Sequence, residues 1–192
     1  MLKGFFNFAD VKLITHENIK IPGITVEKCP KLDYKGYSEF IIYKLHEYIN
    51  TDFVLIINWD GFILNPKQWD DKYLDYDYIG ALWTHEHNFY DDNNNESLIG
   101  NGGFSLRSKK LLEIASKINI PWEPREGKYW HEDAWICVKN KHLYEKNGCK
   151  WAPKELASKF STEQPQKTKI ESFGCHGKLY YSKFKDTLHD NI

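Results

Sequence analysis

The chain has 192 residues, 41% of them hydrophobic, which allows one hydrophobic core and is short for two, so we expect a single domain over residues 1–192. The 26 basic and 27 acidic residues are spread along the chain, which argues against a nucleic-acid partner. Four cysteines lie far apart without a CxxC pair, and no apolar run approaches the ~20 residues of a membrane span. These features predict a cytoplasmic protein with reduced thiols and no transmembrane segment.

Strands are predicted where short β-branched or apolar runs occur, at residues 11–15, 24–26, 53–57 and 78–83. The run at 53–57 is continuous and is typical of a strand covered on both faces, as in a largely parallel sheet. Apolar residues recur at helical spacing between Tyr37 and Ile49. The polar segment 84–97 has the composition of an active-site loop.

The second half of the chain begins with a glycine-rich turn that leads into a short strand ending at Ser108. A helix is predicted over residues 109–118, and another begins within 130–137 and closes at Gly148. A last helix and strand are expected from residue 151 to 160. The order of elements indicates an α/β protein.

The strand predicted at 53–57 runs into Asn58-Trp59-Asp60-Gly61 and so delivers a carboxylate at its carboxyl end. Open α/β sheets place their ligand crevice at such strand ends. Hard divalent cations prefer carboxylate oxygen, which makes Asp60 a candidate metal ligand. The structural alternative is that Asp60 caps the turn before Gly61.

A histidine near the end of the sequence, His176 between Cys175 and Gly177, is a second candidate ligand. If the tail folds back over the crevice, His176 can give an imidazole to the same ion. Lys178 can then reach a pyrophosphate as a point charge. The alternative is that His176 is a surface or packing residue.

Glu132-Asp133 at a predicted helix start offers a general base for a hydroxyl group. The alternative is that the two acids only stabilise the positive helix end, by about 0.3–1 kcal/mol. Gly100 to Gly103 lets the backbone approach a ligand, but it lacks the spacing of a dinucleotide or phosphate loop and by itself indicates a turn. Trp59 and Trp83 lie near these clusters and can stack on sugar faces, although most tryptophans are core residues.

Six stretches occur in a specific serial order, at residues 52–66, 74–81, 100–108, 132–133, 160–163 and 173–177. In that order they resemble the DUF5672 group of predicted glycosyltransferases, within the nucleotide-diphospho-sugar transferase superfamily. The resemblance implies a GT-A, Rossmann-like fold with a central, mostly parallel mixed sheet flanked by helices. Because the chain opens just before the superfamily's second strand, the usual first strand is expected to be missing.

The resemblance places Asn58-Trp59-Asp60 at the superfamily's DxD motif, where the residues bind the donor and Asp60 is the metal-binding acid. Asn58 departs from that motif and leaves one carboxylate at the strand end. Either the ion is then held more loosely, or His176 completes its shell.

The resemblance also matches Asp133 to the acid that serves as base in inverting relatives, with Glu132 as the alternative. Gly102 and Gly103 are expected to line the acceptor side. We assign Arg107 from the same stretch, with Trp83, to substrate binding.

We therefore expect a hexosyltransferase-like glycosyltransferase that moves a sugar from a nucleotide-diphosphate sugar to a glycan or other hydroxyl acceptor, with Mn²⁺ or Mg²⁺ and with inversion. An oligomer is compatible with the sequence. One alternative is a non-catalytic remnant that binds nucleotide sugars or carbohydrate, which the short N-terminus and the single DxD acid favour. Another is a hydrolase, because paired carboxylates also run glycoside hydrolysis.

Overall fold

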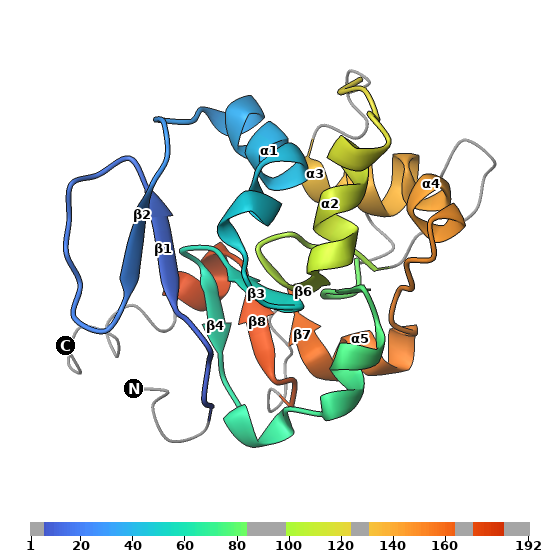
Figure 1. The fold of residues 1–192 in the computed structure, drawn as a ribbon. Coiled ribbons are helices and arrows are strands. Elements are labelled where there is room, and N and C mark those ends of the chain that lie inside the picture. The colour runs from blue at the N-terminus through green and yellow to red at the C-terminus, as the bar shows by residue number, and fades with distance from the viewer. Residues whose placement is uncertain (1–5, 84–98, 124–130, 164–170, 183–192) are drawn as a thin grey trace.

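The computed structural model describes residues 6–83, 99–123, 131–163 and 171–182 (Figure 1). Within these ranges the chain forms a mixed α/β fold of small sheets and helices. The loop expected over residues 84–97 lies outside the described residues. No helix in the described ranges has the length and apolarity needed to span a membrane.

Eight strands are described: β1 (Lys12–Thr15), β2 (Thr25–Lys28), β3 (Phe53–Ile57), β4 (Gly61–Ile63), β5 (Tyr78–Ile79), β6 (Phe104–Ser108), β7 (Ser161–Thr162) and β8 (Gly174–His176). β1 and β2 pair in parallel, as a sheet of two strands. β6 lies between β3 and β5 and is antiparallel to both. β8 lies between β4, to which it is antiparallel, and β7, to which it is parallel.

The expectation of a mostly parallel sheet is wrong for the described strands, because three of their five pairings are antiparallel. The apolar run of β3 suggested burial on both faces, yet β3 lies at the edge of its sheet and Ile57 is 45% exposed. β6, between β3 and β5, is buried throughout, although it carries Ser105 and Arg107. A continuous apolar run therefore did not identify the central strand.

The helical segments are α1 (Tyr34–Tyr43), η1 (Leu45–Tyr48), η2 (Pro66–Gln68), η3 (Asp71–Asp75), α2 (Lys109–Lys117), α3 (Glu132–Ala134), the π-helical η5 (Trp135–Lys139), α4 (Lys141–Lys146) and α5 (Lys154–Phe160). α2 confirms the prediction for 109–118, and Ser108 caps it by accepting a hydrogen bond from the amide of Leu111 at 3.0 Å. α1 begins earlier than predicted, because Asp33 caps it through the amide of Gly36 at 2.7 Å.

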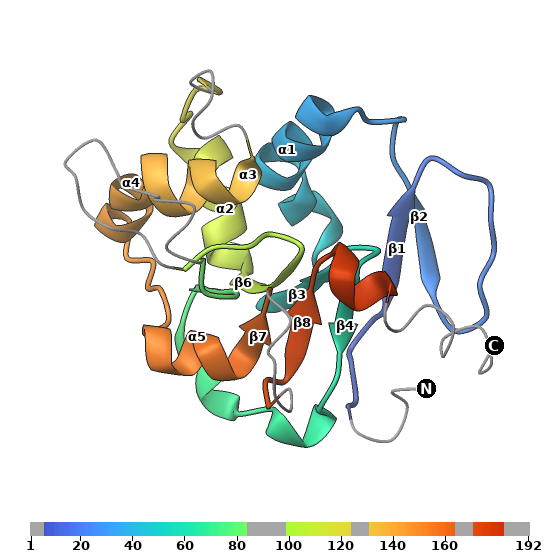
Figure 2. The ribbon, with the colours of Figure 1, turned by 180° about the vertical axis from the view of Figure 1, so that it is seen from behind.

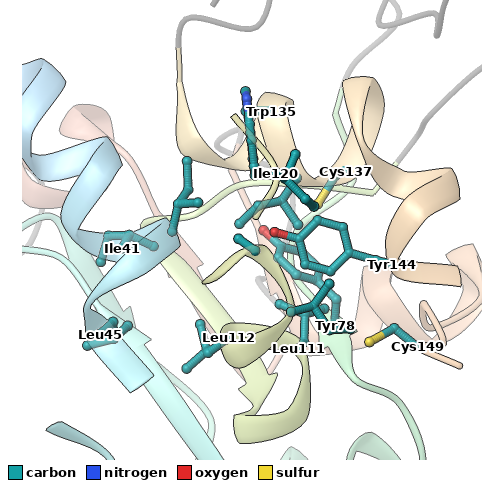
Figure 3. Close-up of a cluster of buried hydrophobic side chains, with 14 of the residues drawn as sticks. Ile41, Leu45, Tyr78, Leu111, Leu112, Ile120, Trp135, Cys137, Tyr144 and Cys149 are labelled. Atoms are coloured by element: carbon teal, nitrogen blue, oxygen red, sulfur yellow. The ribbon is translucent and has the colours of Figure 1, made fainter. Parts of the chain in front are cut away.

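Two hydrophobic clusters hold these elements together. The larger one joins α1, α2, η5 and α4, and Figure 3 shows side chains from these helices gathered around Tyr78. The smaller one is rich in aromatic rings, among them Tyr73, Phe104, Phe160 and Phe173. Figures 1 and 2 show α1, α2, α3 and α4 on one side of the strands and α5 on the other.

Candidate functional site

The turn between β3 and β4 brings Asp60 against His176. Gly61 donates to the carbonyl of Asn58 at 2.9 Å, which closes the turn, and Gly61 is paired with His176 across β4 and β8. The amide of Gly177 donates to the carbonyl of Asp60 at 3.0 Å. As a result, Asp60 Oδ1 lies 3.0 Å from His176 Nε2, although the two residues are far apart in sequence.

The glycine-rich turn lies directly against this pair. The carbonyl of Gly103 accepts a hydrogen bond from the amide of Asn58 at 2.8 Å. A Cβ atom at position 103 would lie 1.9 Å from His176 Nε2, so only glycine fits there while the imidazole keeps its place. The turn therefore packs directly against the Asp60–His176 pair.

The same turn contacts the two acids at the start of α3. The amide of Gly102 donates to Asp133 Oδ2 at 2.9 Å. A Cβ atom at position 102 would lie 1.8 Å from Glu132 Oε1, so glycine is required here as well. Asn101 takes the left-handed conformation, with φ of 64°, and its Oδ1 accepts from the amide of Gly103 at 3.1 Å. Residues 101–103 thus connect the acid pair to Asp60 and His176.

The two acids have different surroundings. Glu132 is buried and its Oε1 accepts from Arg107 Nη2 at 2.8 Å, whereas Asp133 is half-buried. Burial, followed by the charge of Asp133, raises the pKa of Glu132 above its ordinary value, and Arg107 opposes that rise. Arg107 is itself fully buried and donates to Ser105 Oγ at 3.0 Å, so its guanidinium binds groups inside the protein.

Tyr37 of α1 belongs to this site and was not among the predicted site residues. Its hydroxyl donates to Asn58 Oδ1 at 3.0 Å. Burial, followed by the charge of Glu132, raises the pKa of Tyr37 well above its ordinary value. Only the packing of α1 over the end of β3 creates this contact, and the sequence carries no local sign of it.

The remaining predicted site residues lie in different environments. Trp59, at the tip of the turn, is 63% exposed, and Lys178 is exposed beside β8. Trp83 is buried in the larger hydrophobic cluster, where a Cβ atom on Gly100 would lie 1.8 Å from its ring. The structure therefore places Trp59 and Lys178 near Asp60 and His176, and Trp83 in the core.

Asp60 and His176 offer two ligand groups for a divalent cation. Carboxylate oxygen and imidazole nitrogen are both ligands for Mn²⁺. The 3.0 Å separation of His176 Nε2 and Asp60 Oδ1 is that of an ion pair or hydrogen bond, and it is also about the distance between two adjacent ligands of an octahedral ion. The described residues contain no group of three or more His, Cys, Asp or Glu that could hold a metal, so other ligands would come from a diphosphate and water.

Comparison with known proteins identifies a family. Residues 23–176 match the model of a family described as "Protein of unknown function (DUF5672)". No curated protein and no solved structure matches the chain. The family match covers most of the 192 residues and includes Tyr37, Asp60, Asp133 and His176, and the chain therefore belongs to the DUF5672 family.

Proposed function

We propose that the chain is a metal-dependent glycosyltransferase with a GT-A fold, which moves a sugar from a nucleotide-diphosphate sugar to a hydroxyl acceptor. One observation carries the proposal: Asp60 and His176 lie 3.0 Å apart, and the glycine turn beside them also holds Asp133 through the amide of Gly102. The candidate cation site and the candidate base, Asp133, thus both lie against the glycine-rich turn. The acid at the carboxyl end of β3 supports the GT-A assignment.

Asp60 and His176 would hold Mn²⁺ or Mg²⁺, which when bound supplies positive charge to the leaving diphosphate. Lys178 is exposed beside β8 and would add a further charge. The four cysteines, all among the described residues, form no disulfide, which suits the cytoplasmic location that we propose with this activity.

In the proposed reaction the acceptor oxygen attacks the anomeric carbon, and the bond between that carbon and the diphosphate oxygen breaks. The diphosphate leaves with the electron pair of that bond. Asp133 takes the proton of the acceptor hydroxyl, because its carboxylate is half-buried, whereas Glu132 is enclosed and paired with Arg107. Attack from the face opposite the diphosphate inverts the anomeric centre.

The test measures release of free nucleoside diphosphate from a panel of nucleotide sugars, with and without Mn²⁺. Asp60→Asn and His176→Asn should abolish the Mn²⁺-dependent release. Asp133→Asn should reduce transfer by about 10²–10⁴-fold while Mn²⁺ binding is kept. Asp52→Asn and His142→Asn are matched controls, because both side chains are exposed and lie outside the site.

Calorimetric titration of the same variants separates an enzyme from a binding remnant. Mn²⁺-dependent nucleotide binding without any release of nucleoside diphosphate would identify the non-catalytic alternative. Unchanged release by Asp60→Asn would contradict the metal site, and metal-independent cleavage of a model glycoside would indicate a hydrolase.

A further inference from the structure

An exposed tryptophan lies on the same turn as Asp60. Trp59 is 63% exposed, and Tyr181 contacts it with ring centroids 4.9 Å apart and an interplanar angle of 75°. Single exposed apolar residues are common, but an indole that is open to solvent one residue from a candidate ligand-binding carboxylate is a candidate for ligand contact. We call Trp59 and Tyr181 the aromatic platform.

The backbone on both sides holds this platform in place. The amide of Gly177 donates to the carbonyl of Asp60 at 3.0 Å, and the amide of Tyr181 donates to the carbonyl of Gly177 at 3.2 Å. Gly177 has φ of 125°, a conformation that favours glycine, where the chain turns from β8 towards Tyr181. Because these bonds tie Tyr181 to the turn that carries Trp59, the indole is supported from one side and remains open on another.

We propose that the aromatic platform binds a sugar ring of an extended carbohydrate acceptor. The C–H face of a sugar carries partial positive charge and complements the negative face of an indole, while the hydroxyl edges can reach polar groups nearby. Lys178, which is exposed, lies near the platform in the chain and offers such a group. A small donor is bound by enclosing most of its surface, whereas an open indole suits a ligand that continues into solvent.

Carbohydrate binding by the platform can be tested without any sugar transfer. Only the assignment of the bound carbohydrate as an acceptor rests on the proposed function. The chain has seven tryptophans, and the indole N–H signal of Trp59 can be assigned in a ¹⁵N–¹H spectrum by its loss in Trp59→Phe. Titration with methyl glycosides of glucose, galactose, mannose and N-acetylglucosamine, and with oligosaccharides of the same sugars, should shift this signal. Nucleoside diphosphates are titrated separately.

Trp59→Ala should weaken binding of the effective oligosaccharide by about tenfold or more, and Trp59→Phe should restore part of it. Tyr181→Ala should weaken binding although Trp59 is kept, because the indole loses its support. Leu74→Ala is the control, because it removes an exposed apolar side chain, with 40% exposure, on η3. The exposed position of Trp59 makes these variants compatible with folding.

Perturbation of Trp59 by nucleotides alone, or by no ligand in the panel, would overturn the platform as a carbohydrate site. Equal binding by Trp59→Ala and Leu74→Ala would do the same. If carbohydrate shifts Trp59 but no nucleotide sugar is consumed, the platform stands and the proposed glycosyltransferase fails. If nucleotide sugars are consumed while Trp59 stays unperturbed, the proposed function stands and the platform fails.

Discussion

At the scale of single residues, Gly103 fixes the position of the His176 imidazole. A methyl group at this position would lie 1.9 Å from Nε2, so Gly103→Ala should displace the ring from Asp60 and cost about 1–3 kcal/mol in the free energy of unfolding. The displacement can be followed through the imidazole signals of His176 by NMR. We expect these signals to move in Gly103→Ala, and Mn²⁺ binding to weaken.

Gly148→Ala is a matched control for this substitution. Gly148 has φ of 80°, so alanine there costs about 1–2 kcal/mol from backbone strain, yet no atom lies within 4 Å of the added methyl group. The two variants should lose similar stability, but only Gly103→Ala should change the signals of His176. Unchanged His176 signals in Gly103→Ala would refute the close packing of the turn on the imidazole.

Arg107 and Glu132 form a buried ion pair under the same turn. Their closest atoms are 2.8 Å apart and Arg107 is completely buried, so Arg107→Met leaves the Glu132 carboxylate without its partner. We expect a loss of about 3–5 kcal/mol in the free energy of unfolding, measured by urea denaturation. The double variant Arg107→Met with Glu132→Gln should be more stable than Arg107→Met alone, because no unpaired charge remains. A double variant that is less stable than both single variants would contradict this account.

At the scale of elements, the π-helical η5 directly follows α3, which carries Asp133, and depends on Asn140. The amide and the side-chain Nδ2 of Asn140 both donate to the carbonyl of Trp135 at 3.1 Å. Asn140→Ala removes the second bond in a buried position and should cost about 1–2 kcal/mol. π-Helical turns are frequent at functional sites, and relaxation of this one should also alter the bond between Asp133 and Gly102.

Asn147→Ala is the control for Asn140, because Asn147 makes a similar bond to the carbonyl of Leu143 at 2.8 Å but is exposed. Its cost should stay within about 0.5 kcal/mol. Slower exchange of the Gly102 amide hydrogen in Asn140→Ala than in the native protein would oppose the expected loosening of the site.

The elements also show how far sequence reasoning reaches. α2 was predictable because Ser108 gives a clear cap and apolar residues recur at helical spacing. The pairing direction of β3 was not predictable, because an apolar run looks the same in parallel and antiparallel sheets. The buried Arg107 of β6 was assigned to substrate because its partner, Glu132, is 25 residues away and only the fold brings the two together.

The candidate site also contains residues that the sequence could identify and residues that it could not. Asp60 and His176 could be named as candidates because a carboxylate at a strand end and an imidazole near glycine have recognisable chemistry, and the structure brings the two side chains to 3.0 Å. Tyr37 could not, because its role is the bond to Asn58, 21 residues later in the chain. The sequence could not show that Trp83 is a core residue and Trp59 an exposed one. Whether a tryptophan lies in the core or can contact a ligand depends on its exposure, and its exposure follows from packing.

At the scale of the whole molecule, burial of thiols should make the fold sensitive to alkaline pH. Burial raises the pKa of Cys137, Cys149 and Cys175 to about 12 each. A thiol in the unfolded chain has a pKa of about 8.5, so between these values the native state holds more protons than the unfolded state. The stability that these thiols contribute is complete below about pH 8.5 and is lost as the pH rises towards 12.

Urea unfolding under reducing conditions should therefore give a free energy of unfolding that falls steadily above about pH 8.5. Cys149→Ala removes one of the three thiols. Its free energy of unfolding should therefore fall less steeply over the same pH range, whatever its stability at neutral pH. The comparison of slopes separates the titration of the thiol from the cost of the cavity, because a cavity destabilises equally at every pH. Parallel curves for the native protein and Cys149→Ala would show that the buried thiol does not control the alkaline limit of the fold.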